Sequence, residues 1–172
     1  MKRPALPLVL SVIFLIITVI GCGGNKKAPV LLESEKRLAG MYEACQKIEL
    51  TDGASRQIID TGEIQALGSV EIEAVLKRAN GMKKRGKWVG TRFSAVLDSK
   101  GVARPFKELR IEAWDGYVGR IAFDIVERPD TILAYMQNGK PLPREDGPVR
   151  LVVASEDGFY WLRMIIKIEV IR

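Results

Sequence analysis

Residues 114–150, WDGYVGRIAFDIVERPDTILAYMQNGKPLPREDGPVR, constrain the fold of this 172-residue chain more than any other stretch. They contain two turn dipeptides, Asp115-Gly116 and Asn138-Gly139, with apolar residues nearby. Glycine tolerates positive φ, and a preceding Asp or Asn tolerates it better than most residues, so both dipeptides favour the tips of β-hairpins. The stretch therefore predicts a turn-rich β unit. A cradle for a cofactor is the alternative interpretation.

The rest of the chain adds strands and short helices to this unit. Apolar and polar residues alternate, or short apolar runs occur, at residues 47–51, 56–60, 69–79, 107–114 and 160–172, which predicts strands. The nearly all-apolar run 149–154 predicts a central strand. Thr61 is expected to cap a short helix, and apolar residues at helical spacing before Gly101 predict another. The fold class is therefore α+β, with a mixed, curved or barrel-like β-sheet and a few short helices.

The N-terminus has the pattern of an export signal. Lys2 and Arg3 precede an apolar run at residues 8–20, and Gly21 and Cys22 follow it. This order of charge, apolar core and small residue is typical of a signal peptide, and the run is shorter than the ~20 residues of a membrane-spanning helix. Its end, VIGC, resembles the lipobox of bacterial lipoproteins, which predicts lipidation of Cys22. An uncleaved membrane anchor is the alternative.

Three segments follow from this pattern: a lipoprotein signal peptide at residues 1–21, a tether or linker at 22–40, and one domain at 41–172. The linker is expected to carry at most a short helix. Both alternatives for the N-terminus predict that the folded part lies outside the cytoplasm, in the periplasm or at the cell surface, and is anchored to a membrane. Two or more acyl chains on one cysteine would make that anchor stable.

Composition excludes several kinds of chemistry. The chain has no histidine, which removes the commonest general base and the commonest transition-metal ligand. Its two cysteines, Cys22 and Cys45, are too few for a Cys/His zinc site or a disulfide framework. Cys45 is expected to be a small buried apolar residue. The adjacent acids Glu145-Asp146 and Glu156-Asp157 are expected in turns, where carboxylates are usually solvated.

The formal net charge is +6, and one basic cluster stands out. The cluster contains Lys83, Lys84, Arg85 and Lys87, and it follows the turn dipeptide Asn80-Gly81. It lacks interleaved aromatic residues, which nucleic-acid surfaces commonly use for stacking. We therefore expect a solvated hairpin tip at this position, and no nucleic-acid partner.

An ordered set of motifs resembles a known family. The segments are KWVGTRFSAVLDSKGV, DGYVGRIAFDI, TILAYMQNGKPL, GPVRLVV and WLRMIIKIEVI. Together they resemble the sulfite-oxidase-like molybdopterin-binding domain, over roughly residues 48–171. The resemblance implies a mixed α+β fold that binds a pyranopterin with a terminal phosphate. It also implies a molybdenum atom held partly by a cysteine thiolate, located between strand 69–79 and the KWVG segment.

The chain departs from the family at two positions. The interval that should hold the cysteine is LKRANGMKKRGKW, which contains none. A soft thiolate ligand cannot be replaced in kind by the residues present there. The family also commonly has a histidine before the GPVR element, where this chain has Arg144-Glu145-Asp146. No metal ligand is therefore predicted, and the sequence does not identify catalytic residues.

Four residues remain candidates for binding a phosphate or a pterin. Arg92, Arg150 and Arg163 occupy positions compatible with basic contacts of the family, and guanidinium groups suit phosphate oxygens. Tyr117, in the Asp-Gly-Tyr turn, is the fourth candidate. The alternative is structural: strand arginines are often ion-paired, and Tyr117 could pack at a rim.

Two functions are consistent with these features. The first is a membrane-tethered extracytoplasmic lipoprotein with a molybdopterin-oxidoreductase-like domain that lacks the thiolate ligand and binds a small anionic ligand or a partner protein. The second is a molybdopterin-dependent oxidoreductase, or a redox-chain component, that retains the cofactor. The sequence leaves open whether the chain is an enzyme.

Overall fold

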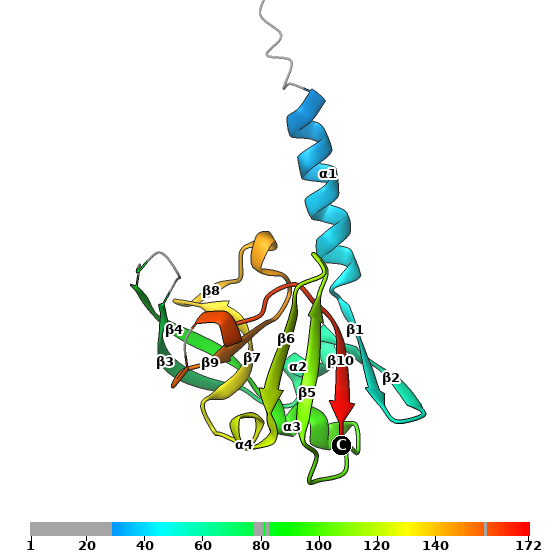
Figure 1. Ribbon diagram of the computed structural model, residues 1–172. Helices are drawn as coiled ribbons and strands as arrows, with labels where there is room; N and C mark the ends of the chain where they lie inside the picture. The colour runs from blue at the N-terminus through cyan, green and yellow to red at the C-terminus, as the bar shows by residue number, and fades with distance from the viewer. Residues whose placement is uncertain (1–28, 78–80, 82, 157) are drawn as a thin grey trace, which may run out of the picture.

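The computed structural model describes residues 29–77, 81, 83–156 and 158–172 (Figure 1). The predicted signal peptide, Cys22 and Asn80 of the predicted turn lie outside the described residues. The helices are α1 (Pro29–Ala44), α2 (Thr61–Ala66), α3 (Phe93–Ser99), α4 (Phe123–Val126) and the 3-10 helices η1 (Arg144–Asp146) and η2 (Gly158–Tyr160). The strands are β1 (Lys47–Asp52), β2 (Ser55–Asp60), β3 (Val70–Lys77), β4 (Lys83–Arg92), β5 (Glu108–Ala113), β6 (Val118–Ala122), β7 (Thr131–Gln137), β8 (Lys140–Pro141), β9 (Arg150–Val153) and β10 (Ile165–Ile171). The predicted α+β class is confirmed.

These strands form two sheets. Sheet A has the order β2-β1-β10-β5-β6, and sheet B has the order β3-β4-β7-β8, with β9 also paired to β7. The neighbours β1 and β10 run parallel, whereas the other paired strands run antiparallel. Parallel pairing of the first and last strands joins the two ends of the domain within one sheet. Sheet B is strongly curved along β3 and β4 (Figure 1).

Apolar side chains from both sheets and from α3 form the main core. Leu50 of β1, Leu133 of β7 and Phe93 of α3 are each at most 1% exposed in this core. A second apolar cluster lies on the other side of sheet B, where Trp88 and Trp161 meet edge to face with ring centroids 5.4 Å apart. Edge-to-face geometry is favourable for aromatic rings because the positive edge of one meets the negative face of the other. The two clusters enclose β9 between them.

Several local predictions are confirmed and several are wrong. The dipeptides Asp115-Gly116 and Asn138-Gly139 do form the turns between β5 and β6 and between β7 and β8. The cap of α2 is Asp60 rather than Thr61, because the Asp60 carboxylate accepts from the N–H of Gly62 and Glu63 completes a capping box. The N–H of Asp60 in turn donates to the Glu63 carboxylate at 3.3 Å.

Two predicted strands differ in their setting. Strand β9 is not central: it pairs with β7 on one side and makes only an isolated bridge at Arg150 on the other. Its apolar run instead reflects burial on both faces, since Leu151 and Val153 join the main core and Val152 joins the second cluster. The predicted strand 160–172 begins only at Ile165, because Met164 has a positive φ of 54° that interrupts an extended chain.

Helix α1 stands out from the body of the domain (Figure 1). It is one continuous helix of 16 residues, and it crosses the expected boundary between linker and domain at residue 40. The side chains of residues 32–37 are exposed, whereas Leu38, Met41 and Tyr42 are half-buried near the domain. Within the described ranges, no helix has the length and apolar character needed to cross a membrane.

Gly90 of β4 allows the close approach of β7 that sheet B requires. A Cβ atom at this position would lie 2.5 Å from the Cα of Ala134 and against the carbonyl oxygen of Leu133. We expect Gly90→Ala to lower the free energy of unfolding by about 1–3 kcal/mol or more, because the backbone of β7 must move. Urea unfolding measures the change.

Gly40→Ala is the matched control for this substitution. Gly40 lies within α1, and a Cβ atom there would meet nothing within 4 Å. The control should be neutral or stabilising by up to about 1 kcal/mol, since alanine favours a helix over glycine. Equal stabilities of Gly90→Ala and the wild type would contradict the role of Gly90.

Candidate functional site

Three of the four predicted binding residues line one pocket. Tyr117, Arg150 and Arg163 face a pocket of about 180 Å³, together with Asp115 and Trp161. They come from three separate places in the chain: the turn between β5 and β6, the start of β9, and the segment between η2 and β10. The remaining lining residues are Ala113, Gly158 and Leu162. The tertiary fold therefore brings together residues that are up to 50 positions apart in the sequence.

Backbone pairing places the two arginines beside each other. Arg150 and Arg163 form an isolated antiparallel bridge, and the N–H of Leu151 donates to the carbonyl oxygen of Leu162 at 2.8 Å. Directly opposed residues in an antiparallel pair have their side chains on the same face of the sheet. Two like charges in this arrangement repel each other, so the bridge needs a nearby negative group.

Asp146 supplies that negative group. Its Oδ1 atom accepts from Nη1 of Arg150 at 3.0 Å and lies 3.7 Å from Nη1 of Arg163. The Asp146 side chain is 17% exposed, so the expectation that this carboxylate is solvated is wrong. Asp146 ends η1, four residues before Arg150. The sequence motif Glu-Asp-Gly gave no signal of this pairing, because the second arginine comes from a distant segment.

The guanidinium of Arg150 is held on several sides. Its Cζ atom lies 5.9 Å from the centroid of the Trp88 ring, which is a favourable cation–π arrangement. Its Nη2 donates to the carbonyl oxygen of Trp161 at 3.4 Å. The Arg150 side chain is 11% exposed, whereas that of Arg163 is 52% exposed. The Arg150 side chain is therefore held in place in the pocket lining, whereas the Arg163 guanidinium is accessible to solvent.

Tyr117 and Arg92 have different positions. Tyr117 is 50% exposed, and its backbone N–H donates to Oδ1 of Asp115 at 3.0 Å, so the turn presents the ring at the rim of the pocket. Arg92 is exposed at the end of β4, directly before α3, and does not line this pocket. The structure therefore groups Tyr117, Arg150 and Arg163 and leaves Arg92 outside the group.

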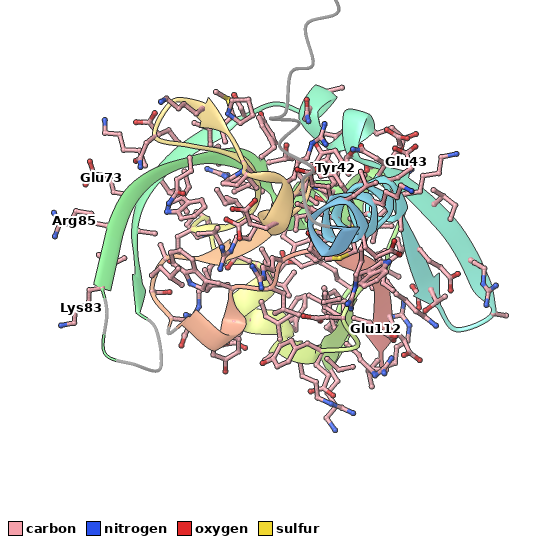
Figure 2. The ribbon with its side chains drawn as sticks, turned by 90° about the horizontal axis from the view of Figure 1, so that it is seen from above. Tyr42, Glu43, Glu73, Lys83, Arg85 and Glu112 are labelled. Carbon is pink, nitrogen blue, oxygen red and sulfur yellow. The ribbon has the colours of Figure 1, made fainter. Side chains whose placement is uncertain are left out.

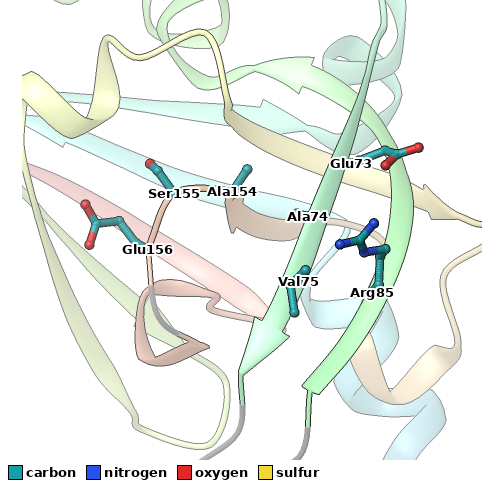
Figure 3. A pocket seen from close by; sticks show the side chains of 7 residues that line it. All are labelled: Glu73, Ala74, Val75, Arg85, Ala154, Ser155 and Glu156. Carbon is teal, nitrogen blue, oxygen red and sulfur yellow. The ribbon is translucent and has the colours of Figure 1, made fainter.

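A second pocket lies between the curved edge of sheet B and the turn after β9 (Figure 3). Its volume is about 370 Å³, and its polar lining includes Glu73, Arg85, Ser155 and Glu156. The Glu156 carboxylate already accepts from Nη1 of Arg128 at 2.8 Å. Sequence reasoning did not find this pocket, because a gap between β3 and the chain after β9 depends on how far sheet B curves.

Among the described residues, no cysteine lines either pocket. Cys45 precedes β1, is 0% exposed and lines neither pocket. Burial raises the pKa of its thiol from the usual 9.0 to about 11, because desolvation disfavours the charged form. Among the residues that the structure describes, no three His, Cys, Asp or Glu side chains are grouped as metal ligands. The expectation that Cys45 is a small buried residue is confirmed.

Cys45 should be unreactive in the folded protein. At pH 8 we expect iodoacetamide to modify Cys45 at least about tenfold more slowly in the native state than in urea, because burial blocks access and suppresses the thiolate. Peptide mass spectrometry separates Cys45 from Cys22. Equal native and denatured rates would contradict the buried position.

Comparisons with known proteins agree with this architecture. The family model described as the oxidoreductase molybdopterin binding domain matches residues 60–172. The chain is also similar to the crystal structure of the sulfane dehydrogenase SoxCD from Paracoccus pantotrophus, with a TM-score of 0.66 and 20% sequence identity over 74% of this chain. The similar region is 39% of that chain, so this chain corresponds to well under half of the SoxCD chain. A comparison with curated proteins finds no match.

The family model covers more than half of the chain and reaches from the end of β2 to the last residue. Its match contains β3 to β10, both arginines of the pocket and the carboxylate between them. The chain therefore belongs to the family of oxidoreductase molybdopterin-binding domains, with a sulfite-oxidase-like fold.

Proposed function

We propose that this chain is a membrane-tethered extracytoplasmic lipoprotein whose domain binds a small anionic ligand at the Arg150–Arg163 pocket. The observation that carries the proposal is the convergence of two guanidinium groups and Tyr117 on one pocket. Guanidinium groups match carboxylate, sulfate and phosphate oxygens in geometry and charge. The domain keeps the scaffold of its family and binds without a thiolate-held metal.

The residues at the pocket do not fit a metal held by a thiolate. The lining side chains that carry polar groups are Asp115, Tyr117, Arg150, Trp161 and Arg163. None offers sulfur, and arginine does not act as a metal ligand because it stays protonated. The soft-ligand chemistry that the family resemblance implies therefore has no donor here. The same set of groups suits an anion.

Volume and charge indicate the size of the ligand. The pocket of about 180 Å³ is smaller than the ~300–1,000 Å³ that drug-sized ligands occupy, so a small oxyanion fits better than a complete pterin. Asp146 shares one oxygen between the two arginines and neutralises part of their charge. An anion at Arg163 must therefore compete with a carboxylate of the chain itself.

Substitutions at Arg163 and Asp146 test the binding of an anion. Arg163→Gln should weaken the affinity for sulfate or phosphate by about tenfold, because it removes a charge-assisted hydrogen bond. Asp146→Asn should strengthen it by a similar factor, since the competing negative charge is lost. Isothermal titration calorimetry of the full chain with each anion measures both changes.

Arg120→Gln is the control for charge alone. Arg120 is exposed on β6, pairs with Glu108 and does not line the pocket. Its substitution removes the same positive charge and should leave the affinity within about twofold of the wild type. No measurable heat with either anion for wild type and Asp146→Asn alike would contradict the proposal.

Membership of the family favours a second candidate function, a molybdopterin-dependent oxidoreductase or redox-chain component that retains the cofactor. The two candidates differ in metal content. The chain made in a host that synthesises molybdopterin should contain less than about 0.05 molybdenum atoms per chain, because no thiolate reaches the pocket. Elemental analysis near one atom per chain, with pterin fluorescence after denaturation, would support the second candidate and contradict the first.

The lipid anchor is tested separately. Cys22→Ser should move the chain from the membrane fraction to a form that lacks acyl chains, or block processing of residues 1–21, since serine cannot form the thioether. Labelling with a radioactive or alkyne fatty acid, followed by fractionation, measures the attachment. Cys45→Ser is the matched control and should keep its label, whereas label retained in Cys22→Ser would refute the anchor.

A further inference from the structure

The positive charge of the chain is concentrated in one hairpin. Residues 74–97 contain seven Lys or Arg residues and no Asp or Glu. Outside this segment the chain has 20 basic and 21 acidic residues, as the totals of 27 and 21 require. The formal net charge of +6 is therefore a property of the segment that contains β3 and β4, whereas the rest of the chain is close to neutral.

Three of these basic residues lie on one face of β4. Lys83, Arg85 and Lys87 occupy alternate positions of the strand and are all exposed. Successive side chains of a strand point to opposite faces, so alternate residues share a face. Figure 2 shows Lys83 and Arg85 at the outer edge of the hairpin, with Glu73 of β3 near Arg85. We call Lys83, Arg85 and Lys87 the basic face.

Carboxylates of β3 neutralise part of this face, since the register places Glu73 opposite Lys87, whereas Arg85 and Lys83 lie nearer the tip of the hairpin. Lys87 pairs with Glu71 of β3 at 3.3 Å, with both side chains more than half exposed, which makes the pair weak. Among the described residues, no carboxylate lies within ion-pair distance of Lys83 or Arg85. Elsewhere on the domain, exposed arginines such as Arg56, Arg120 and Arg172 do have carboxylate partners.

The arrangement is unfavourable for the stability of the hairpin itself. The register of β3 and β4 pairs Lys77 directly with Lys83. Like charges in directly opposed positions of an antiparallel pair destabilise it. The basic face therefore gains no stability from this pairing, and a negative partner would offset its charge.

We propose that the basic face docks an extended acidic segment of a partner protein. Side chains two residues apart on β4 are ~6.6–6.8 Å apart along the strand, and carboxylates at alternate positions of an extended partner have the same spacing. Three guanidinium or ammonium groups can therefore each meet one carboxylate without strain. Charge complementarity of this kind also speeds association, because it steers the partner toward the hairpin.

The geometry of α1 favours a protein over the membrane surface as the partner. Residues 29–37 of α1 precede the half-buried Leu38, extend for ~14 Å and stand out from the domain (Figure 1). The Debye length at physiological salt is ~8 Å, so the charge of anionic lipids is largely screened at that separation. This step alone rests on the proposed lipid anchor at Cys22, because the anchor sets which end of α1 faces the membrane.

The test uses the full chain, purified in a neutral detergent, and a fluorescein-labelled peptide of alternating Glu and Gly residues. Fluorescence anisotropy gives the affinity at low and at physiological salt. The triple variant K83E/R85E/K87E should bind the peptide at least about tenfold more weakly than the wild type, because three attractive contacts become repulsive. Binding by the wild type should weaken as salt rises.

A matched triple variant, K47E/K107E/K140E, separates the basic face from net charge. These three lysines are exposed on other parts of the domain, and their reversal changes the net charge by the same amount. The control should bind within about twofold of the wild type. Circular dichroism and urea unfolding verify that each variant is folded, and K83Q/R85Q/K87Q replaces the reversed variant should that one fail to fold.

Three results would overturn the proposal: equal weakening in the two triple variants, unchanged binding by K83E/R85E/K87E, or no peptide binding by the wild type at low salt. Protection of the hairpin from trypsin by nanodiscs of anionic lipid, without peptide binding, would assign the face to the membrane instead. These results are independent of the anion pocket, because Lys83, Arg85 and Lys87 do not line it. Failure of anion binding at Arg163 would leave the basic face unaffected.

Discussion

Burial of apolar side chains on both faces of β9 is the interaction on which the rest of the structure depends. Leu151 and Val153 pack into the core between the two sheets, and Val152 packs into the second cluster with Trp88 and Trp161. A strand buried on both faces has almost no freedom to shift its register, since a slip by one residue would exchange its two faces. The chain after β9 therefore runs antiparallel to it, with Arg163 paired to Arg150, before it forms β10 of sheet A.

The pocket is a consequence of that path. When the chain returns along β9, Arg163 comes to lie opposite Arg150, and the repulsion between the two guanidinium groups requires a counter-charge. Asp146, the last residue of η1, supplies this negative charge, and it lies four residues before the start of β9. A positive site of this kind is created by backbone pairing and moderated by a carboxylate. The anion binding proposed above rests on this arrangement of charges, and among the described residues that line the pocket none offers a thiolate.

Features that depend on neighbouring residues could be predicted from the sequence. The Asp-Gly and Asn-Gly turns were identified correctly because positive φ is a local property of glycine, and the α+β class followed from short alternating runs. The boundary at Ile165 could not be predicted, because the positive φ of Met164 has no signal in a β-branched and apolar run. The pairing of Asp146 was missed for a similar reason. An acid in a turn is usually solvated, and Asp146 is partly buried only because Arg163, from a distant segment, lies beside it.

By itself the sequence determined the family, the absence of a histidine and of a cysteine at the expected ligand position, and the concentration of charge in residues 74–97. These properties depend only on residue order and composition, and they are the same in any conformation of the chain. Only the tertiary structure decided that Arg150 and Arg163 are neighbours and that Arg92 lies apart from them. It also decided that Oδ1 of Asp146 lies near the guanidinium groups of both Arg150 and Arg163. The physical reason is that Coulomb energies fall with distance in space and not with separation along the chain, so charge partners are set by the packing of the strands.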